Sequence, residues 1–210
     1  MTTYGINFAN ETPDTWTLCI YQFLPGSVGL ESVAWKQTRV PRNGESGIEW
    51  NMEYVACLAE YKQSGGKGFY KALQRMRTEL GRHWNCVYED DVQQLWEAGA
   101  TTSGQLLISN RSPQLANLGI GMDGSLALVK RSVYSGNNAQ FAGKPKFYVA
   151  LFHELLQGEI ISGNQVYGPL EVVFSGDRNY KNFVARIEGS RFIFEEAGTK
   201  NRVEAPYEPR

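Results

Sequence analysis

Ile48-Glu-Trp50-Asn-Met52-Glu-Tyr54, residues 48–54, alternates apolar and polar side chains with a period of two. Successive side chains of a β-strand point to opposite faces, so this pattern places the four apolar residues on one face. An amphipathic helix would instead need apolar residues three or four positions apart. The stretch therefore predicts a half-buried strand.

Similar alternation, or a short apolar run, recurs on both sides of this stretch. Further strands are expected at residues 16–23, 32–40, 106–108, 126–129, 146–152, 171–174, 183–187 and 192–194. Turn residues such as Asp123-Gly124 and Gly189-Ser190 separate them. The pattern predicts an all-β fold, an antiparallel β-sandwich that is either jelly-roll-like or a partly closed barrel. We find no repeat with the period of a solenoid.

One segment does not fit the strand pattern. Between Gly66 and Gly81, five apolar residues fall at helical spacing, namely Phe69, Ala72, Leu73, Met76 and Leu80. The residues between them are good helix formers. Two interpretations stay open, which are a short helix at 68–80 and a strand that begins at Phe69 and leads into a polar loop.

Length and composition suit a folded domain. The chain has 210 residues, of which 42% are hydrophobic and 20% charged, so it can form a sizeable core. All-β sandwiches reach this size as one unit. We expect a single β-sandwich domain at 1–196. Residues 197–210 hold two prolines and little apolar content, so we expect a loose C-terminal tail.

The formal net charge of −1 argues against nucleic acid as a partner, because nucleic-acid-binding domains are usually basic. No run approaches the roughly 18 apolar residues of a membrane span. The N-terminus lacks the basic and apolar regions of a secretory signal, so we expect a cytoplasmic protein. The three cysteines, Cys19, Cys57 and Cys86, are then expected to be buried, reduced thiols.

Gly119-Ile-Gly121-Met-Asp-Gly124 matches the dinucleotide-binding pattern G-x-G-x-x-G. That site needs a helix after the glycines and an acidic residue about 20 positions later. A strand-like run follows instead, and no Asp or Glu occurs between Gly124 and Glu154. We therefore interpret Asp123-Gly124 as a hairpin turn and expect no cofactor. His83 and Cys86 have half the spacing of a zinc site but no second pair of ligands, so we expect no metal.

His153, Glu154 and Glu159 are the candidate catalytic residues, because they follow the strongly predicted strand at 146–152. A histidine that a carboxylate orients can act as a general base. An ordinary loop histidine is the competing interpretation, so we assign no catalytic residue. We find no G-x-S-x-G motif of an α/β-hydrolase.

Ligand-binding candidates come from aromatic and basic side chains. Trp84 and Trp96 are candidates for stacking on a sugar, although core packing is the commoner fate of strand tryptophans. Lys71 and Arg75 belong to a basic stretch that also contains Lys67, Arg77 and Arg82. This stretch either binds an anionic group or pairs with the acidic residues at 89–91. Asn10-Glu-Thr12 and Asn110-Arg-Ser112 are glycosylation tripeptides of the kind that occurs by chance.

Several segments, taken in order, resemble the RhiA-like family. They are Cys19-Ile-Tyr-Gln-Phe-Leu-Pro25, Val33-Ala-Trp35-Lys, Trp50-Asn-Met-Glu-Tyr54, Gly119-Ile-Gly-Met-Asp-Gly124, Pro145-Lys-Phe-Tyr-Val-Ala-Leu-Phe152 and Gly158-Glu-Ile-Ile161. The resemblance implies a β-sandwich of a bacterial family named for expression in the rhizosphere. It brings no enzymatic activity and no catalytic residues. The family is strand-like at 69–80, where this chain is more basic and more helix-prone.

Three functions follow from these observations. We favour a non-enzymatic protein that binds a small polar ligand such as a saccharide, or a protein partner, in plant-associated bacteria. The first alternative is a hydrolase-type enzyme with a His/carboxylate site at the end of the strand 146–152. The second is a self-assembling β protein that forms a homo-oligomer.

Overall fold

The computed structural model describes residues 2–25, 27–176 and 178–208 of the chain. These residues form strands and no helix, so none of them lies in a helix able to cross a membrane. The strands build four sheets, and none of these sheets closes into a barrel across the described residues. The predicted all-β sandwich class is confirmed. Two strand pairs, β1 with β16 and β8 with β10, are parallel within otherwise antiparallel sheets.

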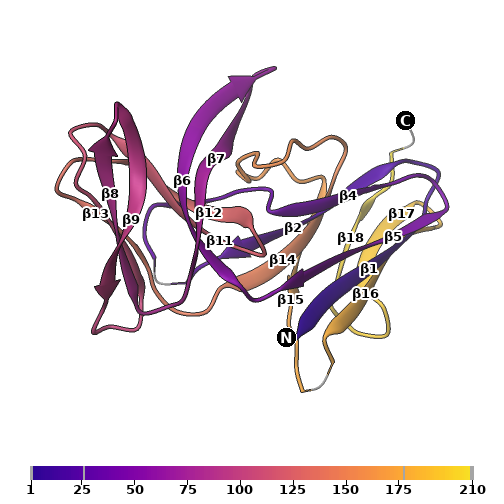
Figure 1. The fold of residues 1–210 in the computed structure, drawn as a ribbon. Helices are drawn as coiled ribbons and strands as arrows, with labels where there is room; N and C mark the ends of the chain where they lie inside the picture. The colour runs from indigo at the N-terminus through magenta and orange to yellow at the C-terminus, as the bar shows by residue number, and fades with distance from the viewer. Residues whose placement is uncertain (1, 26, 177, 209–210) are drawn as a thin grey trace.

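Two sheets form the first sandwich, which lies on the right of Figure 1. This sandwich contains both ends of the chain. One sheet has the order β18 (Arg202–Pro206), β17 (Arg191–Glu196), β16 (Tyr180–Glu188), β1 (Thr3–Glu11) and β5 (Gly44–Asn51). The other has the order β15 (Tyr167–Val172), β14 (Lys146–Phe152), β2 (Trp16–Phe23) and β4 (Lys36–Val40). Trp16 packs edge-on against Phe192 between the two sheets, at 5.2 Å between ring centroids.

The second sandwich lies on the left of Figure 1. One sheet has the order β13 (Asn138–Phe141), β10 (Leu106–Asn110), β8 (Arg82–Glu89) and β9 (Val92–Ala100). The other has the order β3 (Leu30–Ser32), β12 (Ser125–Val133), β11 (Ala116–Met122), β6 (Tyr54–Ser64) and β7 (Lys67–Thr78). Buried side chains from all four sheets join in one large hydrophobic cluster.

The two sandwiches have matching strand connections. β1 pairs parallel with β16 and antiparallel with β5, and β10 pairs parallel with β8 and antiparallel with β13. Likewise β2 lies between β4 and β14, and β11 lies between β12 and β6. The chain therefore contains two repeats, β1–β9 and β10–β17, with β3 and β18 as additions. This period is far longer than that of a solenoid.

The repeats exchange strands. β1, β2, β4 and β5 of the first repeat pack with β14–β17 of the second, whereas β10–β13 pack with β6–β9. The registers agree, because Leu18 faces Leu151 in one sandwich and Leu118 faces Leu58 in the other. Each sandwich therefore depends on both halves of the chain. The expectation of one domain over residues 1–196 stays a prediction.

Asn10 ties together the turn after β1. Its Nδ2 donates to the backbone oxygens of Asp14, at 2.8 Å, and Val40, at 3.2 Å. Its Oδ1 accepts the hydroxyl of Thr12, at 2.8 Å. The amide is 1% exposed, so these bonds satisfy polar groups that water cannot reach.

Asn110 makes the same bonds after β10. Its Nδ2 donates to the oxygens of Gln114, at 2.7 Å, and Val133, at 2.8 Å, and its Oδ1 accepts the hydroxyl of Ser112, at 2.7 Å. Asn-x-Thr/Ser-Pro at 10–13 and 110–113 is thus the signature of the repeat. The sequence analysis interpreted both tripeptides as chance glycosylation patterns and so missed it.

Replacing Asn110 with Ala leaves two backbone oxygens and the Ser112 N–H and hydroxyl without their buried partner. We expect this to lower the free energy of unfolding by about 2–4 kcal/mol. Because each sandwich contains strands of both repeats, circular dichroism and tryptophan fluorescence should still report one coincident urea transition. Asn182→Ala, at a solvent-exposed hydrogen bond, is the control and should cost under about 1 kcal/mol. Two separate transitions would contradict the coupling.

The predicted helix at 68–80 is wrong, because β7 occupies 67–78 and pairs along its length with β6. The alternative, a strand from Phe69 that leads into a polar loop, is right about the strand but ends it too early, since β7 continues to Thr78. From Tyr70 to Thr78, buried or half-buried residues alternate with exposed ones, as in any strand. Leu58 faces Gln74 and Ala59 faces Ala72, so a β-bulge leaves Leu73 as an extra, exposed residue. The helical spacing therefore arises because an apolar residue, Leu73, stands at an exposed position of the strand.

Two further expectations differ from the structure. The alternating stretch at 48–54 is not one strand, because β5 ends at Asn51 and β6 begins at Tyr54, where the chain crosses between sandwiches. The C-terminal segment expected to be loose contains β18, which pairs with β17. Val203 packs on the core and supplies the apolar contact that holds this short strand.

The three cysteines are free and buried, as the sequence predicts. Burial raises the pKa of Cys57 to about 12 and that of Cys86 to about 11, from 9.0. Burial likewise raises the pKa of Cys19.

A thiol whose pKa is raised on folding stabilises the protein fully below pH 9.0, the pKa it has when unfolded. That stability is lost as the pH rises from there towards the folded pKa. We expect the urea midpoint to fall between about pH 8 and about pH 10.5, and to fall less in Cys57→Ala. An equal fall in both proteins would assign the loss to other groups.

Candidate functional site

Residues 153–166 join β14 to β15 and form a long loop, which we call the strap. The corresponding connection in the first repeat, between β6 and β7, is the short turn at Gly65-Gly66. The strap is therefore an addition to only one repeat. Figure 1 shows it in orange between β7 and β4, where the two sandwiches meet.

Backbone hydrogen bonds join the strap to both neighbours. Gly158 N donates to Ala34 O at 3.0 Å, and Gly158 O accepts from Tyr70 N of β7 at 2.9 Å. Ile160 N donates to Gly68 O at 3.0 Å. The strap thus connects the edge of β7 to the segment after β3. Its position is fixed by the backbone, as a functional loop on a rigid frame requires.

Gly158 is required where the strap approaches β7. Its φ is +79°, and a Cβ there would lie 2.3 Å from Tyr70 O. No side chain fits this approach without moving the backbone of one segment.

Glu159 fixes the inside of the strap. It is 3% exposed, and its Oε1 accepts from Asn164 Nδ2 while its Oε2 accepts from Leu156 N, both at 2.9 Å. Lys67 Nζ lies 3.4 Å from Oε2 and also donates to Glu154 O at 3.1 Å. The buried carboxylate is thereby compensated by a cation and two N–H donors.

A hollow of about 850 Å³ opens beside the strap. All three candidate residues from the sequence, His153, Glu154 and Glu159, line it. The ring of His153 stacks on Trp16, with 4.6 Å between centroids, so its plane is fixed. Glu154 is exposed at the rim. The sequence correctly grouped these residues, while the structure gives Glu159 a role in holding the strap.

The sequence analysis missed the other polar residues of the hollow. They are Asp14, Thr15 and Arg39 from the first sandwich, Tyr61 and Lys67 from the β6–β7 hairpin, and Ser162 and Asn164 from the strap. No local pattern marks them, because they come from distant segments. The length of the segment between the strands at 146–152 and 171–174 was the available signal.

The ligand-binding candidates are scattered. Trp84 is 5% exposed and donates its indole N–H to Thr78 Oγ1 at 2.9 Å, which makes it a core residue. Trp96 is 50% exposed on β9. Lys71 and Arg75 are exposed on β7. None of these four residues lines the hollow beside the strap.

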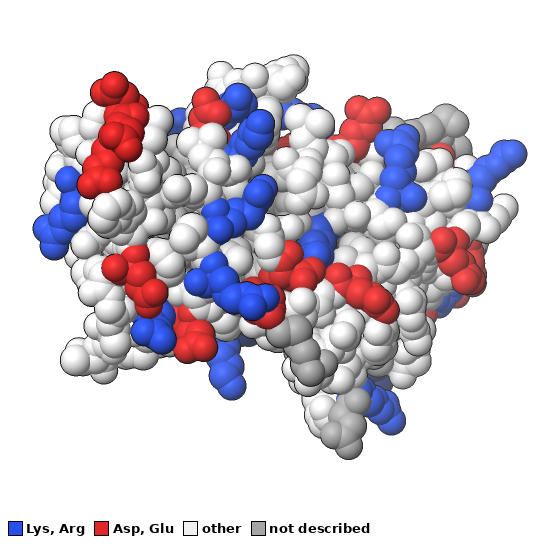
Figure 2. Space-filling view, viewed as in Figure 1, with Lys and Arg blue, Asp and Glu red and all other residues white. Residues whose placement is uncertain are grey.

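The basic stretch finds acidic partners other than those expected at 89–91. Lys67 pairs with Glu159, Arg77 with Glu53 and Arg82 with Glu97. The acidic residues instead form the β8–β9 turn, where Asp90 and Asp91 have φ values of 49° and 62°. On the face shown in Figure 2, Lys and Arg alternate with Asp and Glu. No single-sign field for a polyanion is visible there.

The sheets show the structural roles of the glycine motif at 119–124 and of the His83–Cys86 pair. Asp123 and Gly124 have φ values of 50° and 71° and turn the chain between β11 and β12, as predicted. His83 and Cys86 lie on opposite sides of β8, with His83 Nε2 2.8 Å from Ser109 Oγ and Cys86 in the core. Among the described residues, no three His, Cys, Asp or Glu side chains gather in the manner of a metal site.

Comparison with known proteins gives a family match that spans both repeats. A family model described as RhiA matches residues 1–196, which include all of β1–β17 and the strap. The chain belongs to the RhiA family. No curated protein and no solved structure matches the chain. The family model ends before β18, so the matched segment contains both repeats without the C-terminal strand.

The strap's attachment to β7 is tested by Gly158→Ala. The added methyl group meets Tyr70 O and also strains a backbone at positive φ. We expect faster amide hydrogen exchange across the strap and at Tyr70, together with a loss of about 2 kcal/mol or more of unfolding free energy.

Gly163→Ala is the matched control, because Gly163 has φ +84° but nothing within 4 Å of the added Cβ. It should show only the loss of about 1 kcal/mol that positive φ causes. Similar exchange patterns in both variants would show that the close approach is unimportant.

Proposed function

We propose that this RhiA-family protein is a non-enzymatic binding protein whose hollow takes a small polar ligand, a neutral saccharide. The strap is the observation that carries the proposal. One repeat has gained a long loop that the other lacks, and this loop walls a hollow of about 850 Å³ with fixed polar groups. Long ordered loops in compact folds are usually functional.

The polar groups of the hollow are of mixed type. Neither the Arg39 guanidinium nor the Glu154 carboxylate has a hydrogen bond or ion pair with any other described residue. A sugar hydroxyl both donates to a carboxylate and accepts from a guanidinium, so one saccharide can satisfy both. The two charges are opposite in sign, which favours a neutral ligand over a polyanion.

The hydrolase alternative uses the same hollow. Its general base would be His153, and of the two candidate glutamates only Glu154 would be available to orient it, because both oxygens of Glu159 already hold the strap. Loss of an observed glycosidase or esterase activity in His153→Ala would favour it. The assignment of Glu159 to the fold supports binding over catalysis.

Self-assembly through sheet edges is the third function considered. The edge strand β7 carries Lys67, Lys71, Arg75 and Arg77, which disfavour pairing with a second copy. At the β9 edge, Leu95 N already donates to Gln74 Oε1 at 2.7 Å. Both features protect edges and support a function in solution-phase binding.

A glycan array followed by calorimetry on the full chain tests the proposal. We expect Arg39→Ala to lower the affinity for the saccharide found on the array at least about tenfold, since hydrogen bonds to charged groups contribute about 1.5–3 kcal/mol. Arg42→Ala removes an exposed arginine outside the hollow and should leave affinity unchanged. Trp96→Ala should also bind normally. Loss of binding in Trp96→Ala alone would move the site to the face of β9, and an array without hits would remove the proposal.

A further inference from the structure

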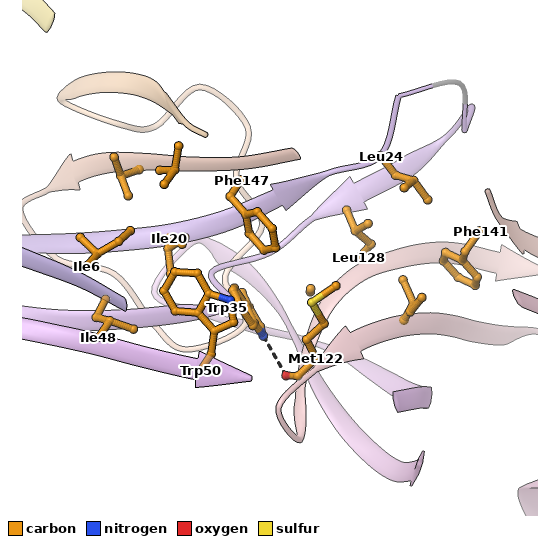
Figure 3. Close-up of a cluster of buried hydrophobic side chains, with 14 of the residues drawn as sticks. Ile6, Ile20, Leu24, Trp35, Ile48, Trp50, Met122, Leu128, Phe141 and Phe147 are labelled. Carbon is orange, nitrogen blue, oxygen red and sulfur yellow. Dashed lines mark hydrogen bonds between the residues drawn. The ribbon is translucent and has the colours of Figure 1, made fainter. Parts of the chain in front are cut away.

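A second, apolar cavity lies where the chain crosses between the sandwiches. Residues 52–53 lead from β5 to β6, and residues 142–145 lead from β13 to β14. The cavity of about 490 Å³ between these crossings is lined mainly by apolar side chains, including Met52, Met122 and Phe174, and also by Lys144 and by the Lys146–Glu171 ion pair. Figure 3 shows Met122 beside Trp35, whose indole N–H donates to Met122 O at 3.1 Å. The cavity is separate from the hollow beside the strap.

A narrow recess continues inward from this cavity. Tyr54, Leu80 and Pro145 line both spaces, so the recess and the cavity adjoin at these three residues. The recess offers about 10 Å³, which is roughly the room one water-sized atom needs.

Gln22 lines the recess with an unsatisfied donor. The residue is 1% exposed, and its Nε2 has no hydrogen-bond partner among the described residues. A buried donor without a partner costs about fivefold to about 150-fold in the folding equilibrium. Such an amide needs a compensating acceptor, from water or from a ligand.

The repeat shows that packing does not require this amide. Leu18 and Ile20 of β2 correspond to Leu118 and Ile120 of β11, so Gln22 corresponds to Met122. The registers agree, because Gln22 faces Phe147 while Met122 faces Tyr54. An apolar side chain therefore fills the same place in the other sandwich.

We propose that the cavity binds a small apolar molecule with one uncharged acceptor oxygen, such as a ketone, aldehyde or ester. Its oxygen occupies the recess and accepts from Gln22 Nε2, while its hydrocarbon body contacts Met52, Met122 and the aromatic side chains outside. A carboxylate is disfavoured in the recess because every residue lining it is uncharged.

Acetophenone and ethylbenzene are the probes, since they have nearly the same shape and differ in the carbonyl oxygen. The full chain is labelled with ¹³C at its methionine methyl groups. In NMR spectra we expect acetophenone to shift the methyl resonances of Met52 and Met122 in a saturable manner. The resonance of Met76, which does not line the cavity, should stay unchanged. Ethylbenzene should bind about threefold to tenfold more weakly. If acetophenone moves neither methyl group, the proposal is overturned.

Gln22→Met places the residue of the second repeat into the first. We expect the affinity for acetophenone to fall about threefold to tenfold, to the level of ethylbenzene. The affinity for ethylbenzene should stay unchanged. Equal affinity of the two probes in the natural protein, unchanged in Gln22→Met, would overturn the proposal and leave water as the partner of Gln22. The comparison of probes in the natural protein stands even if the variant does not fold.

Discussion

Backbone pairing between distant segments is the constraint on which the structure depends. β2 pairs with β14 and β11 pairs with β6, and each pair joins two repeats rather than neighbours in the chain. Because hydrogen bonds in these central ladders are buried, neither repeat can satisfy its own strands alone. The crossings at 52–53 and 142–145 follow from this exchange, and so does the apolar cavity between them. The strap adds a further connection at the opposite side of the junction.

The sequence predicts the strands that have long apolar runs. β2 and β14 were predicted with the bounds that the structure shows, because their apolar runs are long and end at turn residues. β7 was not, since Leu73 is apolar but exposed at a bulge, and the apolar residues of the segment therefore do not follow its buried ones. The bulge depends on pairing with β6, which the segment's own residues do not reveal. β18 depends in the same way on pairing with β17.

The candidate site was predictable only where its residues are close in sequence. His153, Glu154 and Glu159 belong to one segment and line one hollow, whereas Arg39 and Lys67 come from β4 and β7, which are distant in sequence. Glu159 illustrates a second limit, because a carboxylate that binds a loop and one that moves a proton look alike in sequence. Its two N–H donors and Lys67 decide between these roles. Asn10 and Asn110 show the converse, as their shared pattern was visible but its buried hydrogen bonds were not.

The parallel pair of β1 and β16 also determines when the protein can fold during synthesis. Phe8 of β1 lies beside Phe183 of β16, so the N-terminal strand waits for nearly the whole chain to leave the ribosome. Until then β1, β2, β4 and β5 expose apolar faces that only β14–β17 can cover. Such non-local topologies fold slowly and are vulnerable to aggregation while incomplete. A nascent chain of this family therefore has a long interval in which protection by chaperones is valuable.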